Sequence, residues 1–100
     1  MQHFTAIVLK IIQNIPAGKV STYGQIASMA GNPQGARQVS RILHSMSRSH
    51  NLPWHRVINS KGKISLPLGG GYQEQKELLE SEGISFDAKD RVDFKKFENS

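Results

Sequence analysis

Two helical patterns joined by a very short turn constrain this fold more than any other feature of the sequence. The first begins after Ser21 or Thr22, either of which can cap a helix, and ends at Gly31. The second begins at Asn32-Pro33, because Asn caps free amide groups and Pro suits the first helical position, and extends to about Met46. Two helices so close in sequence predict a helix-turn-helix.

The second of these helices has two unlike faces. At helical spacing, one face is apolar and the other carries cations and amides. The apolar face consists of Ala36, Val39, Ile42, Leu43 and Met46, and the polar face of Gln34, Arg37, Gln38, Arg41 and His44. An exposed cationic face on the second helix is typical of a helix-turn-helix that contacts nucleic acid.

The remaining segments predict a small α/β domain that is mainly α-helical. Residues 4–15 have the apolar spacing of an amphipathic helix, and residues 72–82 form a last helix closed by Gly83. Two short apolar stretches, 52–58 and 64–66, surround a Lys-Gly-Lys tip and predict a basic β-hairpin, the wing of a winged helix-turn-helix. We expect one domain over residues 1–100, in which residues 84–100 add at most a weak strand with Val92 and Phe94 and then a less ordered tail.

Charge is distributed very unevenly along the chain. Residues 1–73 contain eight Lys and Arg residues and no acid, and the first acid is Glu74. A basic body of this kind predicts a polyanionic partner, and nucleic acid is the foremost candidate.

Several functional classes are excluded or disfavoured. The chain has no Cys, so it has no disulfide, no Cys-ligated metal and no thiol nucleophile. No apolar run approaches the roughly 20 residues that cross a bilayer, and no secretion signal precedes Phe4, so we expect a cytoplasmic protein without membrane contact. The four His residues lack metal-ligand spacing, and Gly69-Gly70-Gly71 lacks the Lys-Ser/Thr ending of a P-loop, so we expect neither metal nor cofactor.

The segment Pro53-Trp54-His55-Arg56-Val57 carries a family resemblance. It resembles the Pro-Cys-His-Arg-Val active-site motif of the O6-alkylguanine-DNA alkyltransferases, whose C-terminal domain most of this chain is similar to. The supporting blocks occur in the family's order and near its spacings: Gly18 to Ala27, Gly31-Asn32-Pro33, Ala36-Arg37-Gln38-Val39 and Glu82-Gly83. The resemblance implies the winged helix-turn-helix of that domain.

The decisive departure from the family is Trp54, which stands where the enzymes have their nucleophilic Cys. An indole offers one N–H donor and no thiolate, so alkyl transfer to this position is excluded. Trp in this place resembles the alkyltransferase-like proteins. This implies a non-enzymatic sensor that binds O6-alkylguanine in double-stranded DNA, flips the base and passes the lesion to nucleotide excision repair proteins, without a cofactor and as a monomer.

The resemblance also implies a set of site residues. Arg37 matches the finger that fills the gap left by the flipped nucleotide, and Tyr23 matches the residue that pushes on the adjoining phosphate. Further DNA contacts are expected from Asn32, Gln38, Arg41, Ser60, Lys61 and Lys63, and the lesion pocket from Tyr23, Trp54, Val57, Leu68 and Gly69. His55 and Glu82 are the remains of the enzymes' proton relay, with a structural role here.

Two other functions remain open from the sequence. A winged-helix transcription regulator would explain the basic body, but it would leave the motif around Trp54 without a purpose. An enzyme acting on a flipped base would use His55 or Glu82 as its acid or base.

Overall fold

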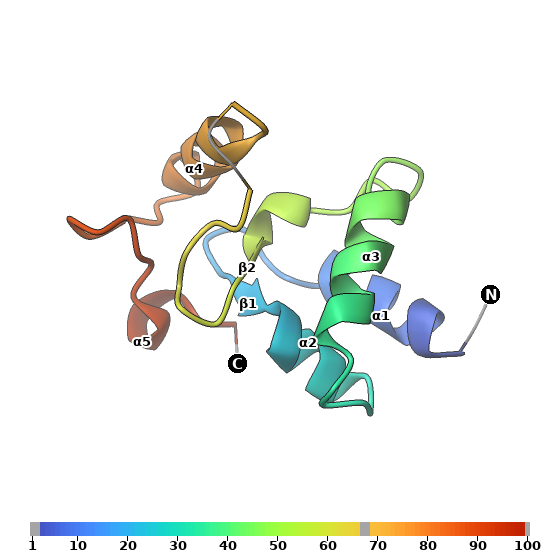
Figure 1. The fold of residues 1–100 in the computed structure, drawn as a ribbon. Coiled ribbons are helices and arrows are strands. Elements are labelled where there is room, and N and C mark those ends of the chain that lie inside the picture. Colours follow the sequence, from blue (N-terminus) through green and yellow to red (C-terminus); the bar gives the residue numbers. More distant parts are fainter. Residues whose placement is uncertain (1–2, 67–68, 100) are drawn as a thin grey trace.

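The computed structural model describes residues 3–66 and 69–99 and consists mainly of helices (Figure 1). The helices are α1 (His3–Gln13), α2 (Tyr23–Met29), α3 (Ala36–Met46), α4 (Tyr72–Ser81) and α5 (Phe94–Phe97), with a 3-10 turn at Trp54–Arg56. Two short strands, β1 (Ser21–Thr22) and β2 (Val57–Ile58), complete the order of elements. No helix in the described part of the chain has the length and apolar character needed to cross a membrane.

The first three helices pack on one another and form the larger part of the core (Figure 1). Thr22 caps α2, because its side chain accepts a hydrogen bond from the Gln25 N–H at 3.0 Å, while the Gln25 side chain accepts one from the Thr22 N–H at 2.8 Å. This reciprocal cap fixes the position at which the chain leaves β1 and turns into α2. The buried side chains of this half are Val8, Leu9, Ile12, Ile15, Ile26, Ala27, Val39, Leu43, Leu52 and Val57.

A two-stranded parallel sheet joins this half to the rest of the molecule. Ser21 pairs with Val57, and Thr22 pairs with Ile58. Successive residues of a strand point to opposite faces, so Val57 packs into the core formed by α1, α2 and α3, and Ile58 into a second core. The small sheet is therefore the wall between two apolar clusters.

The second core contains Val20, Ile58, Leu79, Ile84, Val92 and Phe97. The segment after Glu82, expected to become a less ordered tail, thus contributes three buried side chains. The expectation of a weak strand containing Val92 and Phe94 is wrong, since Phe94 opens helix α5 and Val92 forms only an isolated bridge with Phe86. Asp93 caps α5 by accepting a hydrogen bond from the Lys95 N–H, and this short cap ends the extended run.

Helix α3 begins later than the sequence indicated. Asn32-Pro33 belongs to a separate turn, and α3 starts at Ala36 after Gly35. The Asn32 N–H donates to the Ala27 carbonyl at 2.9 Å, and the Asn32 carbonyl accepts from the Gly35 N–H at 2.9 Å. Asn32 therefore closes the end of α2 instead of capping the next helix. The helix-turn-helix itself and the exposed positions of Arg37, Gln38, Arg41 and His44 are as expected.

The expected β-hairpin around Lys61-Gly62-Lys63 is a loop. β2 pairs with β1 and not with residues 64–66, which form no strand. The loop is closed by two backbone bonds, from the Asn59 N–H to the Lys63 carbonyl and from the Gly62 N–H to the Asn59 carbonyl. The Asn59 side chain also accepts from the N–H groups of Lys61 and Lys63 at 3.0 Å each. Asn59 thus replaces the missing strand ladder with its own side chain.

Gly62 holds this loop against the C-terminal segment. Its φ is +78°, its carbonyl accepts from the Val92 N–H at 2.8 Å, and a Cβ would lie 2.8 Å from the Val92 carbonyl oxygen. Gly69 has a similar φ of +80°, with nothing within 4 Å of such a Cβ.

We predict that Gly62→Ala lowers the free energy of unfolding by roughly 2–4 kcal/mol, through backbone strain together with the clash. Gly69→Ala carries the backbone strain alone and should cost about 1 kcal/mol. Urea unfolding of the two variants beside the parent measures the difference, and equal losses in both would contradict the close approach of Gly62 to Val92.

Candidate functional site

A cavity of about 210 Å³ lies against α3 and contains Trp54 in its wall. Tyr23 lies at the start of α2, and Trp54 at the start of the 3-10 turn that precedes β2. The Trp54 and His55 rings meet edge to face, with centroids 6.1 Å apart. The lining residues are Tyr23, Ser40, Leu43, His44, Ser47, Trp54, Leu66 and Gln75.

The structure places the expected pocket residues in different environments. Tyr23 and Trp54 line the cavity. Val57 does not, because β2 turns its side chain into the core, where it is 1% exposed. Gly69 is exposed and outside the lining, and Leu68 lies outside the described residues.

Sequence reasoning missed most of the cavity wall. Ser40 lies three and four residues before Leu43 and His44, and Ser47 lies four and three residues after them, so all four share one face of α3 and its C-terminal end. The helical period of the sequence predicts that these residues share a face, but only the fold shows that this face borders Trp54.

Gln75 was also missed, and it is a buried polar group with satisfied hydrogen bonds. Its side chain is on α4, is 3% exposed, and donates to the carbonyls of His55 and Val57 at 3.0 and 3.1 Å. Gln75 thereby positions the strand that follows the Trp54 turn. A polar residue four positions before the fully buried Leu79 was the available signal.

Glu82 joins three segments that lie far apart in sequence. Its carboxylate accepts hydrogen bonds from His55 Nε2 at 2.8 Å, from Arg56 Nη2 at 2.7 Å and from the Gly18 N–H at 3.2 Å. Arg56 also donates to the Ile15 carbonyl at 2.9 Å. The expected proximity of His55 and Glu82 is present, and Arg56 and Gly18 complete the arrangement.

The protonation of Glu82 follows from these contacts. Burial alone raises the pKa of a carboxyl group, but the hydrogen bonds from Arg56, His55 and Gly18 outweigh it and lower the pKa of Glu82 to about 2. Glu82 is thus a carboxylate at neutral pH, with all its neighbours acting as donors. Burial also raises the pKa of the Tyr23 phenol, which keeps it neutral.

The expected DNA-contacting residues of α3 lie together on its exposed face. Arg37, Gln38 and Arg41 are all exposed, and Asn32 donates a hydrogen bond to the Gln38 side chain at 3.4 Å. Asn32 thus joins the end of the α2–α3 turn to this face. None of these side chains contributes to the core.

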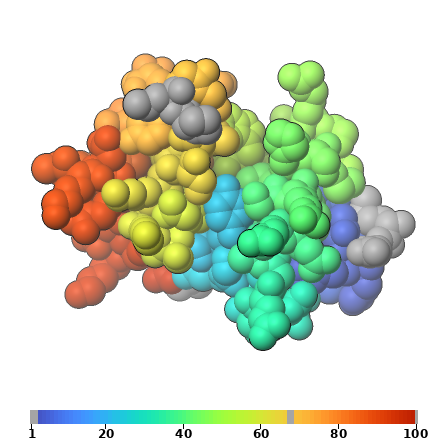
Figure 2. Space-filling model, in the orientation of Figure 1, coloured from blue at the N-terminus to red at the C-terminus, as the bar shows by residue number. Residues whose placement is uncertain are grey.

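The remaining expected contacts are on the loop after β2. Ser60, Lys61 and Lys63 are exposed, and the loop that carries them is closed by Asn59. Figure 2 shows the segments around residue 60 and around residue 40 on the same visible face of the molecule.

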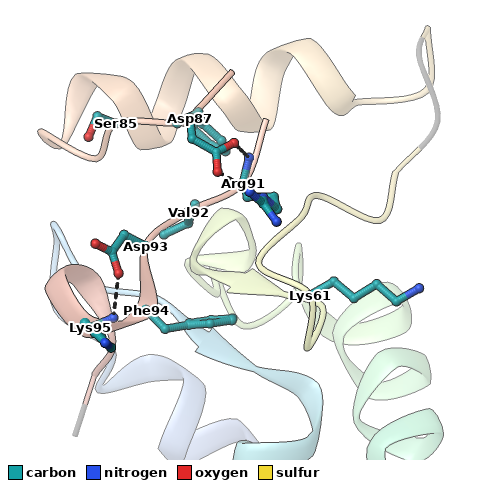
Figure 3. Close-up of a pocket in the computed structure, with 9 residues that line it drawn as sticks. Lys61, Ser85, Asp87, Arg91, Val92, Asp93, Phe94 and Lys95 are labelled. Atoms are coloured by element: carbon teal, nitrogen blue, oxygen red, sulfur yellow. Dashed lines mark hydrogen bonds and ion pairs between the residues drawn. The ribbon is translucent and has the colours of Figure 1, made fainter. Parts of the chain in front are cut away.

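A larger cleft of about 550 Å³ lies between this loop and the C-terminal segment (Figure 3). Its acids are already engaged, because Asp87 pairs with Arg91 at 2.9 Å and Asp93 accepts from the Lys95 N–H at 3.0 Å. It shares no lining residue with the cavity at Trp54. The smaller cavity, beside the exposed cations of α3, is therefore the candidate site.

No three His, Asp or Glu side chains gather in a way that could hold a metal ion within residues 3–66 and 69–99. The cavity wall offers hydroxyl, imidazole, amide and indole groups, and it contains no carboxylate among the described residues. Its chemistry is that of hydrogen bonding and stacking.

Comparison with known proteins gives concordant results. The family described as "6-O-methylguanine DNA methyltransferase, DNA binding domain" matches residues 3–84. The chain is 45% identical over 97 residues to a DNA base-flipping protein of Vibrio parahaemolyticus, covering 97% of this chain and 96% of that protein. It is 46% identical over 85 residues to Alkyltransferase-like protein 1 of Schizosaccharomyces pombe, covering 84% of this chain and 79% of that protein.

A solved structure shows the same architecture. The crystal structure of S. pombe Atl1 in complex with damaged DNA containing O6-carboxymethylguanine superposes with a TM-score of 0.84 at 36% identity, over 100% of this chain and 97% of that one. The expected fold class, a small and mainly helical DNA-binding domain of this type, is confirmed.

We predict that Glu82→Gln lowers the free energy of unfolding by about 2–4 kcal/mol, because it leaves the half-buried Arg56 without a counter-charge and His55 without its carboxylate partner. The loss should be smaller in acid. The pKa of Glu82 is lower in the folded state than its ordinary 4.5, so its contribution is complete above pH 4.5 and disappears as pH falls toward 2.

Urea unfolding at pH 7 and across the acid range measures this effect. Glu80→Gln, at an exposed position of α4, is the matched control and should leave stability nearly unchanged. Equal behaviour of the two variants at pH 7 would show that the Glu82 contacts contribute nothing.

Proposed function

The chain belongs to the family of the 6-O-methylguanine-DNA methyltransferase DNA-binding domain, and from this premise we propose that it is a non-enzymatic sensor of O6-alkylguanine in duplex DNA. In this proposal it flips the alkylated base into the cavity at Trp54 and flags the lesion for nucleotide excision repair. The family resemblance carried by the motifs is confirmed by the match over residues 3–84.

The observation that carries the proposal is the position of Trp54 in the cavity wall. The residue that aligns with the nucleophile of the enzymes is an indole, and the chain has no Cys. Alkyl transfer to a thiol therefore cannot occur. The aromatic face of Trp54 instead offers a large apolar contact to a base or its alkyl group.

The cavity suits a single flipped base. Drug-sized ligands occupy clefts of about 300–1,000 Å³, and this cavity of about 210 Å³ is smaller. Extrusion of a base costs least at an already weakened pair, and an O6-alkylated guanine pairs poorly. Arg37, exposed on α3, would fill the vacated position, because a guanidinium can both stack and donate to the orphaned base. Tyr23 would press on the neighbouring phosphate.

Most of the affinity would come from phosphate contacts. Arg41 on α3 and Lys61 and Lys63 on the loop are exposed cations, and none forms a salt bridge within the described residues. Binding should therefore weaken steeply with salt. Discrimination between lesion and normal base would come from the cavity.

The geometry disfavours catalysis by His55 and Glu82. The Glu82 carboxylate is held by Arg56, His55 and the Gly18 N–H, and its pKa of about 2 leaves it without a proton to give at neutral pH. Neither His55 nor Glu82 lines the cavity. Their role in the proposal is to position the turn that carries Trp54.

The protein would act as a cytoplasmic monomer, and the bound, distorted DNA complex would recruit excision repair proteins. A transcription regulator would instead prefer one undamaged sequence.

The principal test compares matched duplexes containing guanine, O6-methylguanine and larger O6-alkylguanines. We expect tighter binding to each lesion than to guanine, and unchanged DNA and protein masses after incubation. A methylated protein, a restored guanine or a released base would refute the non-enzymatic function, and equal binding to all duplexes would refute lesion recognition.

Arg37→Ala should reduce the preference for lesion over guanine roughly tenfold or more, because the vacated position in the duplex is no longer filled. Binding to undamaged DNA should fall far less. Arg48→Ala, which removes an exposed cation from the turn after α3, is the matched control and should keep the preference. Equal ratios in both variants would remove Arg37 from the recognition set.

A further inference from the structure

One wall of the cavity is polar, and helix α3 supplies it. Ser40, His44 and Ser47 border the cavity from a single face of this helix. Trp54 and Leu66 also line the cavity and provide apolar surface. The cavity therefore has one wall that suits a hydrocarbon chain and one that suits hydrogen-bond acceptors.

The polar groups that line the cavity are free to contact a ligand to different degrees. Gln75 already donates to two carbonyl groups. His44 is exposed and lies in the last turn of α3. Its imidazole is the only side chain among the described lining residues that can become a cation, and it presents an N–H donor in either charge state.

The electrostatic surroundings of the cavity favour an anion. Among the described lining residues, α2 contributes only the neutral phenol of Tyr23, and the Trp54 turn, the segment at Leu66 and α4 contribute no charge. Arg41 on α3 lies three residues before His44, Arg48 in the turn after α3 lies four residues after it, and both are exposed. A carboxylate placed here meets cations and no acid of the cavity wall.

We propose that His44 determines specificity in this cavity and selects O6-alkyl substituents that end in a carboxylate. This inference rests on the proposed function and names the class of lesion that the same cavity prefers. A carboxylate taken from water into a cavity needs donors to replace its hydration, and the Ser40 and Ser47 hydroxyls and the His44 imidazole provide them.

Both the size and the charge of the O6 substituent affect how well it fits this cavity. A methyl group adds one carbon to O6 and leaves the polar wall without a partner. A carboxymethyl group extends further and carries the charge at its end. A cavity built with hydrogen-bond donors discriminates strongly against an isostere that cannot accept from them.

The test uses two lesions of similar size and different charge. Duplexes carrying O6-carboxymethylguanine or O6-isobutylguanine are titrated with the protein, with a guanine duplex as reference. We expect the parent to prefer the carboxymethyl lesion by about fivefold to tenfold, because its carboxylate accepts hydrogen bonds from the His44 imidazole and the two serine hydroxyls.

Three variants assign the effect to His44. His44→Gln keeps a donor but cannot carry a charge, so the preference should fall toward one. His44→Lys supplies a cation at the same position, so the preference should persist. His50→Gln removes a histidine that lies after α3 and outside the cavity lining, and it should behave as the parent does.

The outcomes separate this inference from the proposed function. Equal binding of the two lesions by the parent, both tighter than guanine, overturns the selection of carboxylates and leaves lesion sensing intact. A preference that survives in His44→Gln overturns the assignment to His44 and transfers it to Arg41 or the serines. If neither lesion is distinguished from guanine, the proposed function fails and this inference fails with it.

Discussion

The carboxylate of Glu82 is the contact on which the arrangement of this small domain depends. It gathers the Gly18 N–H, His55 and Arg56 around one group at the end of α4, and Arg56 reaches on to the Ile15 carbonyl. These bonds connect the loop after α1, the turn at Trp54 and the C-terminal half. Because the three donors outweigh the cost of burial, the carboxylate remains charged, and a charged acceptor strengthens each of the bonds it receives.

The two-stranded sheet fixes the apolar side chains in the same way that Glu82 fixes the polar groups. Val57 and Ile58 face opposite cores, so the strand that follows Trp54 is fixed from both sides. The turn at Trp54 is therefore held by polar contacts at His55 and Arg56 and by packing at Val57. A side chain that must meet a flipped base in a defined position needs this rigidity.

The sequence was most informative where a pattern was local. Helical spacing and caps predicted α1, α2 and α4, and the motif around Trp54 predicted the family and the proximity of His55 to Glu82. Predictions failed where a distant partner decided the outcome: β2 pairs with β1 instead of forming a hairpin, and Asn32 closes α2 instead of opening α3. Val57 was placed in the pocket because it adjoins Trp54, but strand alternation turns it into the core. The sequence did not predict Ser40 and His44 as cavity residues, because only tertiary packing brings α3 to Trp54.

Loss of the nucleophile changes what the cavity must accomplish. An enzyme that takes the alkyl group ends its own task by forming a covalent bond, so its pocket needs only to align the lesion for one reaction. A sensor has no such step, and its signal lasts only as long as the complex. Its cavity must therefore slow dissociation, which is where differences in affinity between related complexes mostly arise. In the proposed complex, the indole in the wall and the polar side chains of α3 would both serve that purpose, because each would add contacts that must break before the base returns to the duplex. The retained Glu82 contacts are consistent with this view, since they fix the turn that carries Trp54 and supply no proton.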